Sequence, residues 1–161
     1  MTLPTNLEAA RGAIEATYRV RGFAQASVTA SASESNPTAE GLGQVTPIIT
    51  VNEGPRTLIG EVSFEGNSYL AAERLRALVG TRPGDAYYAP RLSADREAVL
   101  LEYLNEGFAS ADVQVAPALS ADSTAASLVF RIAEGPQTLV DHILIVGNRR
   151  TREAVIRNEL L

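Results

Sequence analysis

The chain has 161 residues, of which 45% are hydrophobic and 20% are charged, a balance typical of soluble globular protein. Its formal net charge of −5 argues against a nucleic-acid partner, which needs a basic surface, and no apolar run is long enough to span a bilayer as a helix. Cysteine is absent, which excludes disulfides and thiolate chemistry, and no signal peptide is visible, so the chain is either cytosolic or an internal fragment of a mature protein.

The first predicted elements are a helix over residues 7–21 and two strands over residues 23–30 and 45–52. Leu7, Ile14 and Tyr18 lie on one face of the helix, and Gly22 follows where the helix is expected to end. Small polar residues fill the stretch between the strands, as in a surface loop that tolerates insertions. The sequence therefore predicts a helix and a hairpin without a strand before them.

Residues 58–65 are predicted to form a strand with one buried face, since Val62 and Phe64 alternate with polar residues. Gly66 then turns the chain, and Asn67 or Ser68 is expected to cap the helix that follows. That helix carries an apolar stripe with helical spacing, formed by Ala71, Leu75, Leu78 and Val79. Gly80 is expected to end it.

A second helix is predicted over residues 92–106, with Asp95 on its solvent side and Gly107 as a left-handed cap. Its inner face is formed by Leu92, Val99, Leu100, Tyr103 and Leu104. A strand over residues 109–116 should follow and stop at Pro117. A short turn then leads to a last strand, whose inward residues are Leu128, Phe130 and Ile132.

This order of elements predicts an α+β fold with a three-stranded mixed sheet. The last two strands are joined by a short turn and should form an antiparallel hairpin. The first strand reaches the sheet through a helical crossover, which favours parallel pairing with the third strand. The sheet order is then 1-3-2, with both helices on one face and the second strand on an open edge.

The sequence VNEGPRTLIGEVSFEGN (residues 51–67) returns as IAEGPQTLVDHILIVGN (residues 132–148), 81 positions further on. A period of this size fits small domains in tandem rather than a solenoid. Residues 139–146 are therefore predicted to form another first strand, followed by a helix that contains Val155, Ile156 and Leu160. The predicted division is residues 1–54 for the end of one module, 55–135 for a complete module and 136–161 for the start of a third.

Several short motifs in this order resemble the POTRA domain (polypeptide-transport-associated domain). They are Tyr-x3-Gly-Phe at the end of the second helix, Glu-Gly-Pro after the third strand and Gly-Asn after the first strand. Such β-α-α-β-β modules occur in series in outer-membrane β-barrel assembly factors of the BamA and TamA type. The resemblance implies a periplasmic location, a C-terminal membrane β-barrel in the parent protein, and binding of unfolded outer-membrane proteins or accessory subunits of the assembly machine.

The resemblance and the physics of sheets together point to the second strand as the binding site. An exposed edge offers unpaired backbone N–H and C=O groups that can template another strand. The candidate residues act through their backbone and are Ala109, Ser110, Ala111, Asp112, Val113, Gln114 and Val115. The alternative interpretation is a merely solvated edge, on which Asp112 and Gln114 discourage association.

The two Glu-Gly-Pro segments are the candidate junctions between modules. They consist of Glu53, Gly54 and Pro55, and of Glu134, Gly135 and Pro136. Proline stiffens a junction and glycine permits a sharp turn, so these residues are expected to set the angle between modules. A hinge of variable angle is the functional alternative.

The sequence is also compatible with three other arrangements or functions. The module could belong to a division or secretion protein and act there as a docking scaffold. Residues 136–161 of one molecule could complete residues 1–54 of a neighbour in a swapped, head-to-tail association. An enzyme is the least favoured reading: no phosphate loop, nucleophile elbow or HExxH motif is present, and we expect no catalytic residues, metal site or cofactor.

Overall fold

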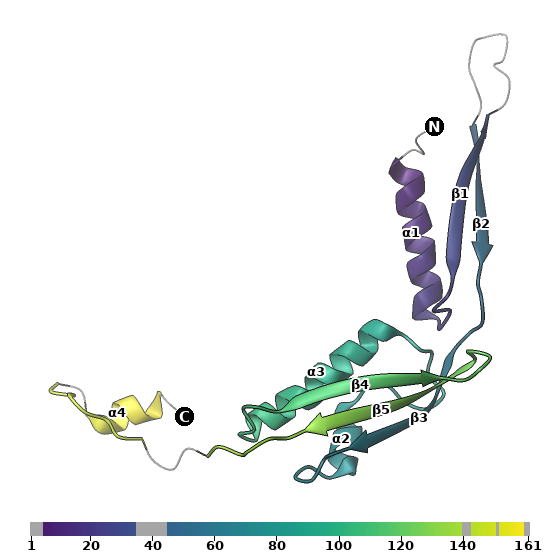
Figure 1. Cartoon of the computed structure of the whole chain (residues 1–161). Helices are drawn as coiled ribbons and strands as arrows, with labels where there is room; N and C mark the ends of the chain where they lie inside the picture. Colours follow the sequence, from purple (N-terminus) through teal and green to yellow (C-terminus); the bar gives the residue numbers. More distant parts are fainter. Residues whose placement is uncertain (1–4, 35–44, 140–142, 151, 160–161) are drawn as a thin grey trace.

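A computed structural model of the chain describes residues 5–34, 45–139, 143–150 and 152–159. Figure 1 shows a helix and hairpin, a complete module and a short helix in succession along the chain. The elements are α1 (Thr5–Val20), β1 (Ser27–Glu34), β2 (Val45–Asn52), β3 (Leu58–Glu65), α2 (Ala72–Leu78), α3 (Ala89–Asn105), β4 (Asp112–Leu119), β5 (Ala125–Ala133) and α4 (Glu153–Asn158). None of the helices in these described ranges is long and apolar enough to cross a membrane.

The complete module has the predicted mixed sheet, in the order β3-β5-β4. β3 runs parallel to the central strand β5, while β4 pairs with β5 in the antiparallel direction. This arrangement confirms the α+β fold class and the order 1-3-2 predicted from the connections. The division of the chain at residues 54 and 135 stays a prediction.

One hydrophobic core lies between this sheet and the helices α2 and α3. β5 supplies every second residue to it: Ala126, Leu128, Phe130 and Ile132 are all buried. Phe130 stacks on Phe64 of β3, with 5.3 Å between the ring centroids. Tyr103 of α3 is fully buried as well and meets Phe108 edge-on. Since each large side chain stabilises the fold by about 1.5–3 kcal/mol when buried, this cluster holds the module together.

A bulge in β3 modifies the simple alternation predicted for this strand. The pairing with β5 shifts between Ile59 and Glu61, so Ile59 and Val62 are both buried although they are three residues apart. The loop before α3 covers the outer side of Ile59: the Gly84 N–H donates to its carbonyl (2.7 Å), and its own N–H donates to the Asp85 carbonyl (2.8 Å). The first half of the β3 edge is therefore closed.

Both helix starts differ from the prediction. α2 begins at Ala72, and neither Asn67 nor Ser68 caps it. The Asn67 side-chain amide instead donates to the Leu70 carbonyl (2.9 Å), in a turn that lets the Leu70 side chain enter the core. α3 begins at Ala89, with Pro90 in its first turn, where the missing N–H would have no partner anyway.

Asp95 is buried, which makes its predicted place on the solvent side of α3 wrong. It lies three residues after Leu92 and four before Val99, and so shares their inner face. Its two carboxylate oxygens accept hydrogen bonds from the Gly80 N–H (2.7 Å) and the Thr81 N–H (3.1 Å). Asp95 thus ties the loop between α2 and α3 to the second helix.

Most flanking elements are of the predicted type, but their bounds differ from those predicted. β1 spans Ser27–Glu34, later than the predicted 23–30, and pairs with β2 in the antiparallel direction. The strand expected over residues 139–146 is not formed at residues 143–146, and residues 140–142 lie outside the described ranges. The following helix is present as α4, although Leu160 lies outside the described residues.

The turn between β4 and β5 supplies a prediction about pH. Asp122 accepts hydrogen bonds from the Ser120 hydroxyl (2.7 Å) and from the Thr124 hydroxyl (2.9 Å) and N–H (3.2 Å), which together lower the pKa of its carboxyl from 3.8 to about 2. Because the folded pKa lies below the unfolded one, the charged form stabilises the fold above about pH 4, and this contribution disappears as the pH falls through about 2. We expect the melting-temperature difference between the wild type and Asp122→Asn to shrink as the pH falls from about 4 to about 2. Circular dichroism melts that show a constant difference would contradict this.

Candidate functional site

The open edge of the module is β4, but it begins later than predicted. Ala109 and Ser110 form a turn and Ala111 lies before the strand, with its N–H donating to the Phe108 carbonyl (3.0 Å). The strand starts at Asp112, so only the last four of the seven predicted residues belong to the edge. The turn was missed because small residues alternate through it as they do through the strand.

Contrary to the prediction, Pro117 does not end β4, which continues to Leu119. The Ser120 N–H donates to the Ala125 carbonyl (2.9 Å), which shows that even-numbered residues of this strand exchange hydrogen bonds with β5. Odd-numbered residues, Pro117 among them, therefore direct their backbone groups away from the sheet. A proline fits there because it has no N–H to lose from the ladder.

The outward backbone groups of β4 belong to Val113, Val115, Pro117 and Leu119. The Val113 carbonyl already accepts a hydrogen bond from Nη1 of Arg96 (3.1 Å), a residue of α3. Pro117 has only a carbonyl to offer. Val115 and Leu119 retain both an N–H and a C=O, which can bind the backbone of an added strand.

The even-numbered side chains of β4 lie on the face of the sheet that points away from the hydrophobic core and the helices α2 and α3. Asp112 and Gln114 are exposed there, and the Gln114 side-chain amide donates to the Asp112 carboxylate (3.1 Å). This pair does not cover the outward backbone groups of β4, but it places a negative charge beside the start of the strand. What the site can do chemically is backbone hydrogen bonding rather than acid–base work.

Each predicted junction holds its glutamate against a tyrosine, which is buried at the second junction (Tyr103) and partly buried at the first (Tyr18). At the second junction, Glu134 accepts hydrogen bonds from the Tyr103 hydroxyl (3.0 Å) and the Tyr69 N–H (2.8 Å). Burial, followed by this hydrogen bond, raises the pKa of Tyr103. At the first junction, a hydrogen bond to Glu53 is the main cause that raises the pKa of Tyr18. The sequence placed Tyr18 and Tyr103 on the apolar faces of their helices but gave no signal that each meets a junction glutamate.

The backbone contacts at the two junctions are also the same. Gly54 and Gly135 both have a positive φ, of 67° and 71°. In each junction, the threonine two residues after the proline donates its N–H to the carbonyl of the glycine that follows a helix. The residue between the proline and the threonine donates a side-chain N–H to the carbonyl of the residue just before that glycine. These pairs are Thr57–Gly22 (2.8 Å) and Thr138–Gly107 (2.8 Å), then Arg56–Arg21 (3.0 Å) and Gln137–Glu106 (2.9 Å). These contacts hold each junction segment against the end of the preceding helix; a role in setting the angle between modules, and the hinge, stay predictions.

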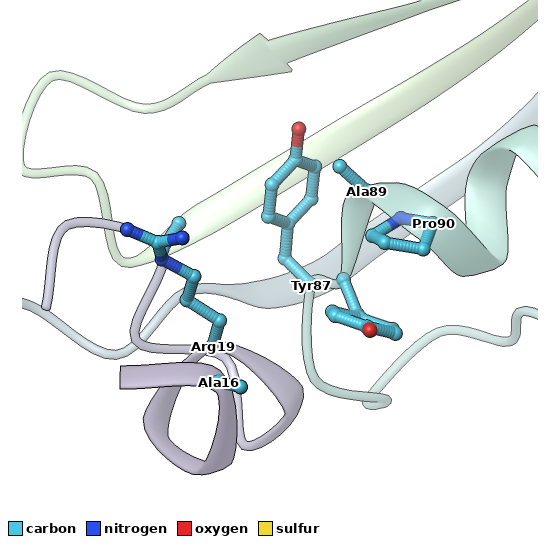
Figure 2. Close-up of a pocket in the computed structure, with 7 residues that line it drawn as sticks. Ala16, Arg19, Tyr87, Ala89 and Pro90 are labelled. Atoms are coloured by element: carbon cyan, nitrogen blue, oxygen red, sulfur yellow. The ribbon is translucent and has the colours of Figure 1, made fainter. Parts of the chain in front are cut away.

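A pocket of about 350 Å³ lies at the first junction, between the end of α1 and the start of α3. Figure 2 shows Ala16 and Arg19 on one side and Tyr87, Ala89 and Pro90 on the other. Arg19 is paired with Glu15 (3.5 Å), and no carboxylate lines the pocket among its described residues. The described part of the chain likewise holds no group of three or more residues able to bind a metal.

Comparison with known proteins adds to this geometry. The family model described as "POTRA: Surface antigen variable number repeat" matches residues 57–135. The chain is 32% identical over 113 residues to the outer membrane protein assembly factor BamA of Neisseria meningitidis serogroup B, which covers 70% of this chain. It is 28% identical over 111 residues, 69% of its length, to a putative outer membrane protein assembly factor of Treponema pallidum. The chain spans only 14% and 13% of the lengths of these relatives.

A similar fold is found in the crystal structure of Haemophilus influenzae BamA POTRA3-5. The match has a TM-score of 0.53 and covers 94% of this chain and 59% of the other. Sequence identity is 19%, so the likeness concerns the fold alone.

Proposed function

The chain belongs to the POTRA domain family, and on that premise we propose that it is a periplasmic scaffold of an outer-membrane protein assembly machine. In this proposal, it binds unfolded barrel precursors or accessory subunits by adding one of their strands to β4. The names of two relatives, which are outer membrane protein assembly factors, support the setting. The outward N–H and C=O groups of Val115 and Leu119 are the observation that carries the mechanism.

Strand addition at this edge suits a protein that handles many clients. Each backbone hydrogen bond contributes only about 0.5–1.5 kcal/mol net, and ordering an unfolded segment costs part of that gain. The contacts are to backbone atoms, so they depend little on the client's sequence. The resulting complex is weak, reversible and compatible with many client sequences, as transport of successive clients requires.

Replacing Val115 with proline tests this mechanism. The substitution removes an outward N–H and leaves the hydrogen bonds between β4 and β5 intact, as Pro117 already does two residues later. We expect the affinity for an unfolded barrel precursor to fall about tenfold, because one hydrogen bond is lost and the ring obstructs the added strand. Fluorescence titration with a precursor diluted from urea would measure the change.

Val115→Thr serves as the matched control, since threonine keeps the N–H and the branched shape. It should bind the precursor like the wild type, and both variants should retain the wild-type circular dichroism spectrum. Equal affinity of Val115→Pro and Val115→Thr would contradict strand addition at β4.

A docking scaffold in a division or secretion protein is the second candidate. It would use the same modules, and the rest of the parent protein distinguishes it from an assembly factor. Self-association also stays a prediction: among the described strands β2 pairs only with β1, and Ile48 and Ile49 of β2 are exposed. A pocket enzyme has less support, because the pocket at the first junction offers no acid–base pair among its described residues.

A further inference from the structure

Among the described residues, Arg96 is the one whose side chain hydrogen-bonds to an outward backbone group of β4. It extends from α3 and donates from Nη1 to the Val113 carbonyl at 3.1 Å, in a partly buried position. That carbonyl points away from β5, because Val113 lies on the odd-numbered side of the strand. The guanidinium therefore stands where the N–H of an added strand would have to bind.

Among the described residues, no carboxylate forms an ion pair with Arg96. Two other arginines of α2 and α3 form ion pairs: Arg74 with Glu102 and Glu106, and Arg91 with Asp85 at 3.6 Å. The hydrogen-bond acceptor of Arg96 is instead the Val113 carbonyl. An arginine carries five N–H donors, so most of its binding capacity remains available to a partner.

We propose that the β4 edge selects extended segments that carry a carboxylate on the α3 side, where it pairs with Arg96. This inference rests on the proposed function, since it names the class of strand that the same edge accepts. An arriving carboxylate draws the guanidinium from the Val113 carbonyl, and that carbonyl can then accept an N–H from the added backbone. Hydrogen bonds between charged groups are roughly twice as strong as neutral ones, so the exchange favours acidic segments.

The other face of the sheet adds to this selectivity. Asp112 is exposed there, so a carboxylate displayed on that side meets a like charge at the start of β4. Acidic residues are thus favoured on the α3 side of an added strand and disfavoured on the other. The site therefore distinguishes a segment with its carboxylate on the α3 side from one with its carboxylate on the Asp112 side. A general attraction to anions would not distinguish them.

Two synthetic peptides test the proposal. Both alternate threonine and valine and have blocked ends; one carries a single glutamate in a valine position, and the other has glutamine in that place. We expect the glutamate peptide to bind about tenfold more tightly at low ionic strength and to lose this advantage at high salt. Amide chemical-shift changes at Val113 and Val115 would report the affinity and the place of binding.

Arg96→Gln should abolish the preference while both peptides still bind. The matched control is Arg131→Gln, which removes an equal charge from an exposed residue of β5 and should keep the preference. Equal binding of the two peptides to the wild type, or a preference that persists in Arg96→Gln, would overturn the role of Arg96 and leave strand addition standing. Failure of both peptides to bind would overturn strand addition and, with it, this inference.

Discussion

Replacing Gly66 with alanine is expected to destabilise the complete module by about 2–5 kcal/mol, the sum of left-handed backbone strain and a clash in a packed region. Gly66 has a φ of 83°, and a Cβ placed on it would lie 2.1 Å from the Ile132 carbonyl oxygen. That oxygen belongs to the backbone of the central strand, so it cannot move aside as a flexible side chain could. The free energy of unfolding, measured with urea, gives the result directly.

Gly84→Ala separates the two causes. Gly84 has a φ of 90°, but nothing lies within 4 Å of an added Cβ. Its replacement should therefore show the backbone strain alone, about 1–2 kcal/mol. If the two variants proved equally stable, contact with β5 would not be the reason for glycine at position 66.

The second large effect is expected for Asp95→Ala, at about 2–4 kcal/mol of unfolding free energy. The substitution removes the acceptor of two N–H groups, those of Gly80 and Thr81, and Thr81 is almost fully buried. The buried Thr81 hydroxyl oxygen has no hydrogen-bond partner among the described residues, so the substitution would leave a second polar group of Thr81, its N–H, unpaired. Urea unfolding of the purified variant measures this cost.

Two controls frame the Asp95 result. Asp95→Asn keeps one acceptor oxygen and should recover part of the lost stability. Glu97→Ala removes a carboxylate from an exposed position on the same helix and should change stability by less than about 0.5 kcal/mol. A similar loss in Asp95→Ala and Glu97→Ala would mean that the loop before α3 does not depend on the carboxylate.

The sheet could be predicted from the sequence because its signals are local. The bounds of β3, Leu58–Glu65, follow from the alternation around Val62 and Phe64, and the strand order follows from general rules on connections. The positive φ of Gly107, 89°, was likewise predicted from its place after a helix. Such features need no knowledge of which distant residues meet.

The features that were missed depend on distant contacts. Asp95 is polar and was predicted to face solvent, yet two N–H groups from another segment make its burial favourable. The start of β4 could not be distinguished from the turn before it, since Ala109 and Ala111 are equally compatible with both. The bond between Arg96 and the Val113 carbonyl has no sequence signal, because it requires the helix and the strand edge to be placed first.

The matching contacts of the two junctions have a geometric consequence. If each module is joined to the next through the same threonine–glycine bond and the same turn, one rotation and one translation relate every successive pair. Repetition of a single rotation and translation generates a screw axis. The open edge strands of a longer array, each equivalent to β4, would then be spaced at a constant distance along this axis and rotated about it by a constant angle.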